Sequence, residues 1–176
     1  VQLDFKANWT EKETGMGFFD FMKGSGKEVK APEPKDMTKQ YSAAERQDIN
    51  NRRRAMALAK EVESLGLEIQ DLAVKVEDDV ATVSGTVGDQ ATREKVILAV
   101  GNTVGIARVD DRIEVSAPEP EAQFHTVVSG ESLSLIAKKY YGDAMKYPVI
   151  FEANKPMLTD PDKIYPGQVL RIPPID

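Results

Sequence analysis

The feature that most limits the fold of this chain is a short, proline-containing segment late in the sequence. Residues 116–122 read Ser-Ala-Pro-Glu-Pro-Glu-Ala, and residues 31–40 also carry two prolines without any apolar period. Prolines stiffen such connectors and disfavour regular structure. We therefore expect two small domains, at 45–116 and 124–174, with a linker at 117–123 between them. Cores of this size bury little surface, so each domain is expected to gain stability by docking on the other.

The first residues of the chain look unlike the rest. The run from Met16 to Lys23, Met-Gly-Phe-Phe-Asp-Phe-Met-Lys, reads as a natural protein start. Codons for Lys12 and Glu13 can form a ribosome-binding sequence at a suitable distance before Met16. We therefore expect residues 1–15 to be an upstream or non-native extension, and residues 16–44 to form an N-terminal segment and linker.

The middle domain is expected to begin with a helix and a hairpin. An apolar stripe with helical spacing ends before Gly66; its members are Ala55, Leu58, Ala59, Val62 and Leu65. Two strands follow, and Asp78-Asp79 is the expected turn between them, which would place Val76 opposite Ala81.

A second helix and a third strand complete this domain. The helix is expected from Gln90 to about Val100, ended by Gly101-Asn102. The strand should run from Ala107 to Val115 with an apolar and a polar face. Asp111 interrupts its apolar face, which predicts a bulge or an edge position there. The order is thus α-β-β-α-β.

The C-terminal domain shows a β-α-α-β pattern. Phe124 to Val128 is expected as the first strand, and Ser132 occupies a helix N-cap position. Pro148 suits the first turn of the second helix, where its missing N–H costs nothing. Val169 to Ile172 is the closing strand. Both domains mix helices and strands in segregated order, so the fold class is α+β.

Composition excludes several classes of protein. The net charge is −6 and no segment is strongly basic, so nucleic acid is not an expected partner. The chain has no cysteine, which removes disulfides and thiolate sites. No stretch approaches the roughly 20 apolar residues of a spanning helix. No export signal is evident, and we expect a cytoplasmic, monomeric protein.

No catalytic constellation is evident either. His125 is the only histidine, and nothing places an acid and a nucleophile around it. The pairs Asp78-Asp79 and Asp110-Asp111 lack the spacing of a calcium loop. We therefore expect a binding protein and not an enzyme.

Both domains resemble known families. Val83-Ser-Gly-Thr-Val87 and the run from Gly101 to Val109, with the α-β-β-α-β order, are similar to a BON domain, in which two helices pack on a three-stranded sheet. The C-terminal blocks resemble a LysM domain; they are Phe124 to Leu133, Ser134 to Gly142, Phe151 to Asn154 and Ile164 to Ile172. LysM domains bind polymers of N-acetylglucosamine such as peptidoglycan.

The LysM resemblance implies a sugar groove between two loops. Loop backbone groups could bond the N-acetyl group, and apolar side chains could cover a sugar face. The same residues could equally serve only the turns and the core. The implied groove residues are Gly130, Glu131, Ser132, Leu133, Asn154, Pro156, Ile164 and Tyr165.

The order of the parts resembles one family as a whole, the bacterial Kbp family of potassium-binding proteins. The resemblance extends from Met16 to the end of the chain, and Phe151 to Leu158 and Asp160 to Pro173 are its most specific blocks. It implies a non-enzymatic K⁺ binder that changes conformation on binding, as a sensor or buffer under osmotic or ionic stress. The alternatives are a peptidoglycan-binding module and a structural adaptor between proteins.

Backbone carbonyls offer a physical basis for such a site. They can replace the hydration shell of K⁺, and a helix C-terminus leaves its last carbonyls free and partly negative. The second helix of the middle domain ends at Gly101, and the segment from Phe21 to Lys27 contains two glycines and could end a short helix. We expect the K⁺ ligands to be the carbonyls of Met22, Ser25, Lys27, Gly101, Thr103 and Ile106. The alternative is a plain helix cap with phenylalanines filling a groove.

Overall fold

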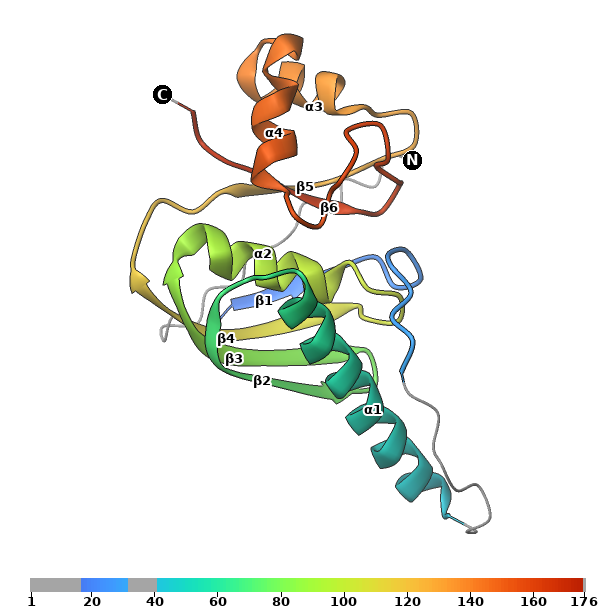
Figure 1. The fold of residues 1–176 in the computed structure, drawn as a ribbon. Helices are drawn as coiled ribbons and strands as arrows, with labels where there is room; N and C mark the ends of the chain where they lie inside the picture. The colour runs from blue at the N-terminus through green and yellow to red at the C-terminus, as the bar shows by residue number, and fades with distance from the viewer. Residues whose placement is uncertain (1–16, 32–40, 176) are drawn as a thin grey trace.

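The computed structural model describes residues 17–31 and 41–175. The expected extension at 1–15 lies outside these residues. The chain forms two domains, and both contain helices and strands as the α+β expectation requires (Figure 1).

The first domain contains a four-stranded sheet in the order β1-β4-β3-β2. Strands β2 (Ile69–Glu77) and β3 (Val80–Asp89) form an antiparallel hairpin, and β3 runs parallel to β4 (Arg108–Ala117). Val76 pairs with Ala81, so the expected hairpin register is confirmed.

The three strands expected of the middle domain are present, and the N-terminal segment adds a fourth, β1 (Gly17–Asp20), antiparallel to β4. Phe19 is buried in the core while its neighbour Phe18 is 39% exposed, which is the alternation of a strand. The short helix expected within Phe21 to Lys27 is also wrong, since these residues form a loop with a turn.

Asp111 does not cause a bulge. The β3–β4 register passes through the Val83–Asp111 pair without a shift. The side chain of Asp111 is fully buried and lies 2.7 Å from Nε of Arg93. The ion pair allows a carboxylate to occupy a core-facing position. The alternation of apolar residues along the strand could not reveal this pairing.

Two helices cover one face of the sheet. Helix α1 (Ala43–Ser64) starts at a capping box in which Ser42 and Glu45 each bond the other's backbone N–H. Helix α2 (Gln90–Gly101) is capped by Asp89 and is buried almost all round, including Leu98 and Ala99. A helix with apolar residues on every side needs cover on every side. The second domain provides that cover, because α2 lies between it and the sheet (Figure 1).

The second domain is a two-stranded sheet with helices on it. Strand β5 (Gln123–Thr126) pairs antiparallel with β6 (Val169–Ile172), and α3 (Leu133–Tyr141), the 3₁₀ turn η1 (Ala144–Lys146) and α4 (Tyr147–Ala153) lie between them in sequence. Ser132 caps α3 and Pro148 lies in the first turn of α4, as expected. Within residues 17–31 and 41–175, every helix is too short or too polar to span a membrane.

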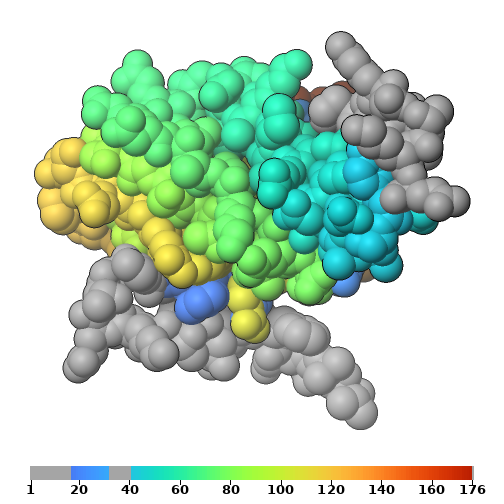
Figure 2. Space-filling model, turned by 90° about the horizontal axis from the view of Figure 1, so that it is seen from below, coloured from blue at the N-terminus to red at the C-terminus, as the bar shows by residue number. Residues whose placement is uncertain are grey.

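The two domains share apolar contacts. The rings of Phe19 in β1 and Phe124 in β5 lie 5.5 Å apart between centroids. Phe124 and Met157 of the second domain both pack against the core of the first. Seen from below, at 90° to the view of Figure 1, the first domain hides almost all of the second domain (Figure 2). The expected mutual docking is therefore present.

Burial along α1 gives a direct test of this core. Leu58 is 2% exposed and Met56, on the same helix, is 66% exposed. Leu58→Ala should lower the free energy of unfolding by about 2–5 kcal/mol, because it removes buried methyl groups and leaves a cavity. Met56→Ala is the matched control and should change it by less than about 0.5 kcal/mol. Denaturant unfolding monitored by circular dichroism measures both, and equal effects would contradict the described burial.

Candidate functional site

The loop that follows β1, residues 21–27, forms an arch over the end of α2. At one end of the arch, the Phe21 N–H donates to the Ala107 carbonyl at 2.7 Å. At the other end, the Lys27 N–H donates to the Asn102 carbonyl at 2.8 Å, and the Lys27 carbonyl accepts from the Val104 N–H at 3.0 Å. The structure thus brings together the two segments that were expected to supply K⁺ ligands, although they are far apart in sequence.

Two of the proposed ligand carbonyls, those of Met22 in the arch and Thr103 after α2, accept hydrogen bonds. The Met22 carbonyl accepts from the N–H of Ser25 at 3.2 Å and from its hydroxyl at 3.0 Å. The Thr103 carbonyl accepts from the Ile106 N–H at 3.1 Å. A carbonyl oxygen has two lone pairs, so the Thr103 oxygen can still accept an ion beside its one hydrogen bond, whereas the Met22 oxygen would have to exchange a hydrogen bond from Ser25 for the ion. Thr103 lies just past the C-terminus of α2, which carries partial negative charge.

Two glycines make this close approach possible. Gly26 has φ +125°, and a Cβ there would lie 2.1 Å from the Asn102 carbonyl oxygen. A Cβ on Gly101 would lie 2.0 Å from the ring of Phe21, so this ring packs directly on the helix end. Side chains at either position would push the arch away from α2.

Asn102 connects this site to the second domain. Its side-chain Nδ2 donates to the Val169 carbonyl and its Oδ1 accepts from the Val169 N–H, both at 2.8 Å. The amide thus pairs with β6 as a neighbouring strand would. The side-chain amide of Asn154 pairs in the same way with the backbone of Arg171, two residues further along β6. The two asparagines cover the free edge of β6.

A buried carboxylate reinforces the junction. Glu94 of α2 is 1% exposed and accepts from Nε2 of Gln90 at 3.0 Å and from the Ala122 N–H at 2.9 Å. It also pairs with Arg171 of β6. Buried charges require such partners, so the domain junction depends on this arrangement.

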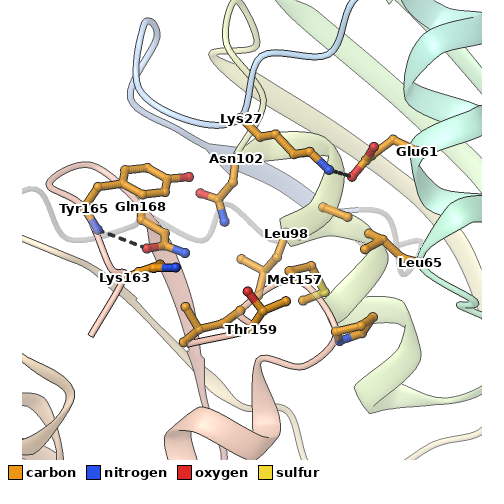
Figure 3. A pocket seen from close by; sticks show the side chains of 13 residues that line it. Lys27, Glu61, Leu65, Leu98, Asn102, Met157, Thr159, Lys163, Tyr165 and Gln168 are labelled. Carbon is orange, nitrogen blue, oxygen red and sulfur yellow. Dashed lines mark hydrogen bonds and ion pairs between the residues drawn. The ribbon is translucent and has the colours of Figure 1, made fainter. Parts of the chain in front are cut away.

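A pocket of about 360 Å³ opens at the same junction (Figure 3). Leu65 and Leu98 of the first domain form part of its apolar wall. Lys27, paired with Glu61, lies at one side, and Tyr165 and Lys163 of the second domain lie at the other (Figure 3).

The expected sugar-groove residues divide between this pocket and structural positions. Pro156 and Tyr165 line the pocket, and burial raises the pKa of the Tyr165 phenol. Ile164 packs against the core of the second domain. Asn154 is 2% exposed and its amide is bonded to β6.

The loop from Gly130 to Leu133 has structural roles. Gly130 has φ +87° in the turn, Ser132 caps α3, and Leu133 is buried. Glu131 accepts from the Val128 N–H at 2.9 Å and lies 2.7 Å from Nε2 of His125. These residues do not line the junction pocket.

His125 is a buried packing residue. Its Nδ1 shares a hydrogen bond with the Tyr140 hydroxyl at 3.2 Å, and its ring meets that of Tyr140 edge to face. Among the described residues, no group of three or more His, Cys, Asp or Glu side chains could hold a metal ion.

Comparison with known proteins agrees with this architecture. Residues 50–117 match the BON domain family and residues 125–173 match the LysM domain family. A protein of Escherichia coli named potassium binding protein Kbp is 42% identical over 159 residues, which cover 90% of this chain and 99% of that protein. The chain belongs to the Kbp family. Its two domains and the N-terminal arch are thus those of a Kbp-family protein.

Other relatives match only a short part of this Kbp-family chain. An uncharacterized protein of Deinococcus radiodurans is 53% identical over 49 residues, or 28% of this chain and 19% of that protein. An esterase of Mycobacterium tuberculosis is 45% identical over 53 residues, or 30% of this chain and 11% of the esterase. These short matches do not bring the activity of the longer proteins to this chain.

The role of the Asn102 side chain was missed from the sequence, whereas packing of the Phe21 ring on the helix end agrees with the alternative of phenylalanines that fill a groove. Asn102 looked like an ordinary helix-end residue, because its partner Val169 is 67 residues away. The spacing of Gly24 and Gly26 was the one local signal of a tight loop at this site.

Removing the Asn102 amide should loosen the junction. Asn102→Ala leaves the Val169 N–H and carbonyl without their side-chain partner, at a cost of about 1–3 kcal/mol. We expect faster hydrogen exchange at the Val169 amide, with little change in the helices of either domain. Asn50→Ala, at an exposed position of α1, is the control. Unchanged exchange at Val169 would contradict the described pairing.

Glu131 predicts a pH-dependent contribution to stability. Burial alone would raise the pKa of this carboxyl, but the hydrogen bonds from Val128 and His125 outweigh it and hold the pKa below its usual value of 4.5. A lowered pKa stabilises the fold above the unfolded-state value, and this stabilisation is lost as pH falls below about 4.5.

Glu131→Gln should therefore reduce the thermal midpoint at pH 7 and converge with the wild type in acid. Glu63→Gln, at an exposed site near the end of α1, is the control. The difference between its thermal midpoint and that of the wild type should not depend on pH. A difference between Glu131→Gln and the wild type that is independent of pH would rule out this role for the carboxylate.

Proposed function

We propose that this chain binds K⁺ without catalysing a reaction, at the contact between the N-terminal arch and the end of α2. Its support is the relative named a potassium-binding protein, which matches 90% of the chain. The observation that carries the location is the pair of hydrogen bonds that joins Lys27 to Asn102 and Val104. The ligands in this proposal remain the carbonyls of Met22, Ser25, Lys27, Gly101, Thr103 and Ile106.

The physical argument for K⁺ is the kind of oxygen that the site offers. K⁺ is weakly hydrated, and neutral carbonyl dipoles can replace its water shell. The partial negative charge at the end of α2 favours a cation without a carboxylate. Small ions such as Mg²⁺ release water reluctantly and need closer, charged ligands. The site should therefore prefer a large monovalent ion.

The same geometry supports a conformational response. The backbone of Asn102 lies between two proposed ligand residues, Gly101 and Thr103, while its side chain pairs with β6. An ion that draws the arch onto α2 would also fix the orientation of Asn102. We propose that ion binding thereby stabilises the docked arrangement of the two domains.

A cellular role follows from this proposal. A K⁺ binder that changes conformation could serve as a cytoplasmic sensor or buffer under osmotic or ionic stress. Fractionation of cells that express the tagged full chain tests the location. Recovery in the cytoplasmic fraction supports this role, and recovery from the periplasm or medium would favour the sugar-binding alternative.

Sugar binding is the second candidate function, because residues 125–173 match the LysM family and Pro156 and Tyr165 line an open pocket. Titration with N-acetylglucosamine oligomers tests it. Shifts confined to the Tyr165 region would support binding there. Capture of protein partners that depends on neither ion nor sugar would favour an adaptor instead.

The two glycines of the arch give a sharp test of the K⁺ proposal. Gly26→Ala forces a Cβ onto the Asn102 carbonyl, whereas a Cβ on Gly24 meets nothing within 4 Å. Both glycines have positive φ, +125° and +97°, so both substitutions carry backbone strain. Only the first should separate the arch from α2.

We expect saturable K⁺ binding by the wild type in isothermal titration calorimetry at constant ionic strength, without a matching response to Na⁺. Gly26→Ala should weaken K⁺ affinity by about tenfold or more, equivalent to at least about 1.4 kcal/mol. Gly24→Ala should weaken it much less. Equal affinities for the two variants would refute the location, and a wild type without a K⁺ response would refute the function.

A further inference from the structure

Arg54 of α1 reaches the α2–β4 loop, which carries two of the six proposed ion ligands, Thr103 and Ile106. Its Nη2 donates to the Gly105 carbonyl at 2.8 Å, and its Nη1 donates to the Asp78 carbonyl. One guanidinium thus bonds a carbonyl in the α2–β4 loop and another in the β2–β3 turn. The planar fork of arginine suits two acceptors in fixed directions, which the single ammonium of lysine does not.

The contact at Gly105 controls the orientation of one peptide group. The Gly105 carbonyl and the Ile106 N–H belong to the same planar unit, and that N–H donates to the Thr103 carbonyl at 3.1 Å. Gly105 has φ +89°, a conformation in which glycine has unusual freedom. Arg54 therefore restrains the peptide that sits between the proposed ligands Thr103 and Ile106.

The β2–β3 turn, whose Asp78 carbonyl accepts from Arg54, is itself held in place by other contacts. The Asp79 carbonyl accepts from the N–H groups of Ala107 and Arg108 at 2.8 and 3.2 Å. The Asp79 carboxylate lies 3.0 Å from Nζ of Lys23, in the arch. The turn thus contacts both segments of the proposed site, and Arg54 joins this turn to α1.

We propose that Arg54 is a positioning residue for K⁺ binding, which holds the Gly105–Ile106 peptide so that the neighbouring carbonyls face the ion. This inference rests on the proposed K⁺ site. Charge alone predicts the opposite effect, because a guanidinium near a cation site repels the cation. The sign of the change in affinity therefore separates positioning from simple electrostatics.

The test compares Arg54→Met with Arg52→Met in the full chain. Arg52 lies on the same helix, pairs with Asp48 and has a 76% exposed side chain, so its substitution removes the same charge without touching the loop. K⁺ and Na⁺ titrations by calorimetry give affinity and selectivity. Hydrogen exchange of the Ile106 amide without K⁺ gives a readout that does not depend on ion binding.

We expect Arg54→Met to weaken K⁺ affinity by about tenfold, to narrow the preference for K⁺ over Na⁺, and to speed exchange at Ile106. Arg54→Lys should restore the charge but only part of the affinity. Arg52→Met should match the wild type in all three measurements. Thermal unfolding of each variant checks that the fold is retained.

The results that would overturn the inference are distinct from failure of the proposed function. Stronger K⁺ binding by Arg54→Met, or the same behaviour as Arg52→Met, overturns the positioning role while the K⁺ site stands. Full rescue by Arg54→Lys would show that one guanidinium bonded to both carbonyls is not needed, and would also overturn it. A wild type that does not respond to K⁺ overturns both proposals.

Discussion

Two backbone hydrogen bonds at Lys27 hold the N-terminal arch against the end of α2, and the arrangement of the proposed site depends on them. The Lys27 N–H bonds Asn102, and its carbonyl bonds the Val104 N–H. This places the Lys27 backbone beside the residues that end α2. The contact requires Gly26, whose missing Cβ leaves room for the Asn102 carbonyl. A segment that is not part of the BON domain match thereby becomes part of the site.

The second domain depends on the same region. Residues 96–101 of α2 are all buried, so this end of the helix needs cover on both sides, and β6 needs a partner for its free edge. Asn102 supplies that partner at Val169, and the buried Glu94 bonds Arg171 two residues further on. Polar contacts set the register of the docking, while the apolar contact between Phe19 and Phe124 contributes burial. Changes at the ion site and at the domain junction should therefore be coupled, as linkage requires.

The sequence was sufficient for elements whose signals are local. Helical spacing, the Asp78-Asp79 turn and the Ser132 cap all depend on neighbouring residues, and the structure confirms them. Strand β1 was missed because its partner β4 lies about 90 residues further along the chain. Asp111 was misread as a break because its partner Arg93 lies on another element. The contact between the arch and α2 was also expected, but that expectation came from the resemblance to the Kbp family and not from a local signal. The contacts of Asn102 and Arg54 could not be found, since nothing local marks side chains that bond distant backbone.

The most direct test of the central claim is carbonyl ¹³C NMR of the labelled full chain during K⁺ titration, with Na⁺ in parallel. The account predicts saturable carbonyl shifts at Met22, Ser25, Lys27, Gly101, Thr103 and Ile106 with K⁺ and not with Na⁺. Neutral backbone oxygens would then be the ligands, at the contact between the arch and α2. Shifts confined to side-chain carboxylates, or carbonyl shifts in the second domain alone, would contradict it.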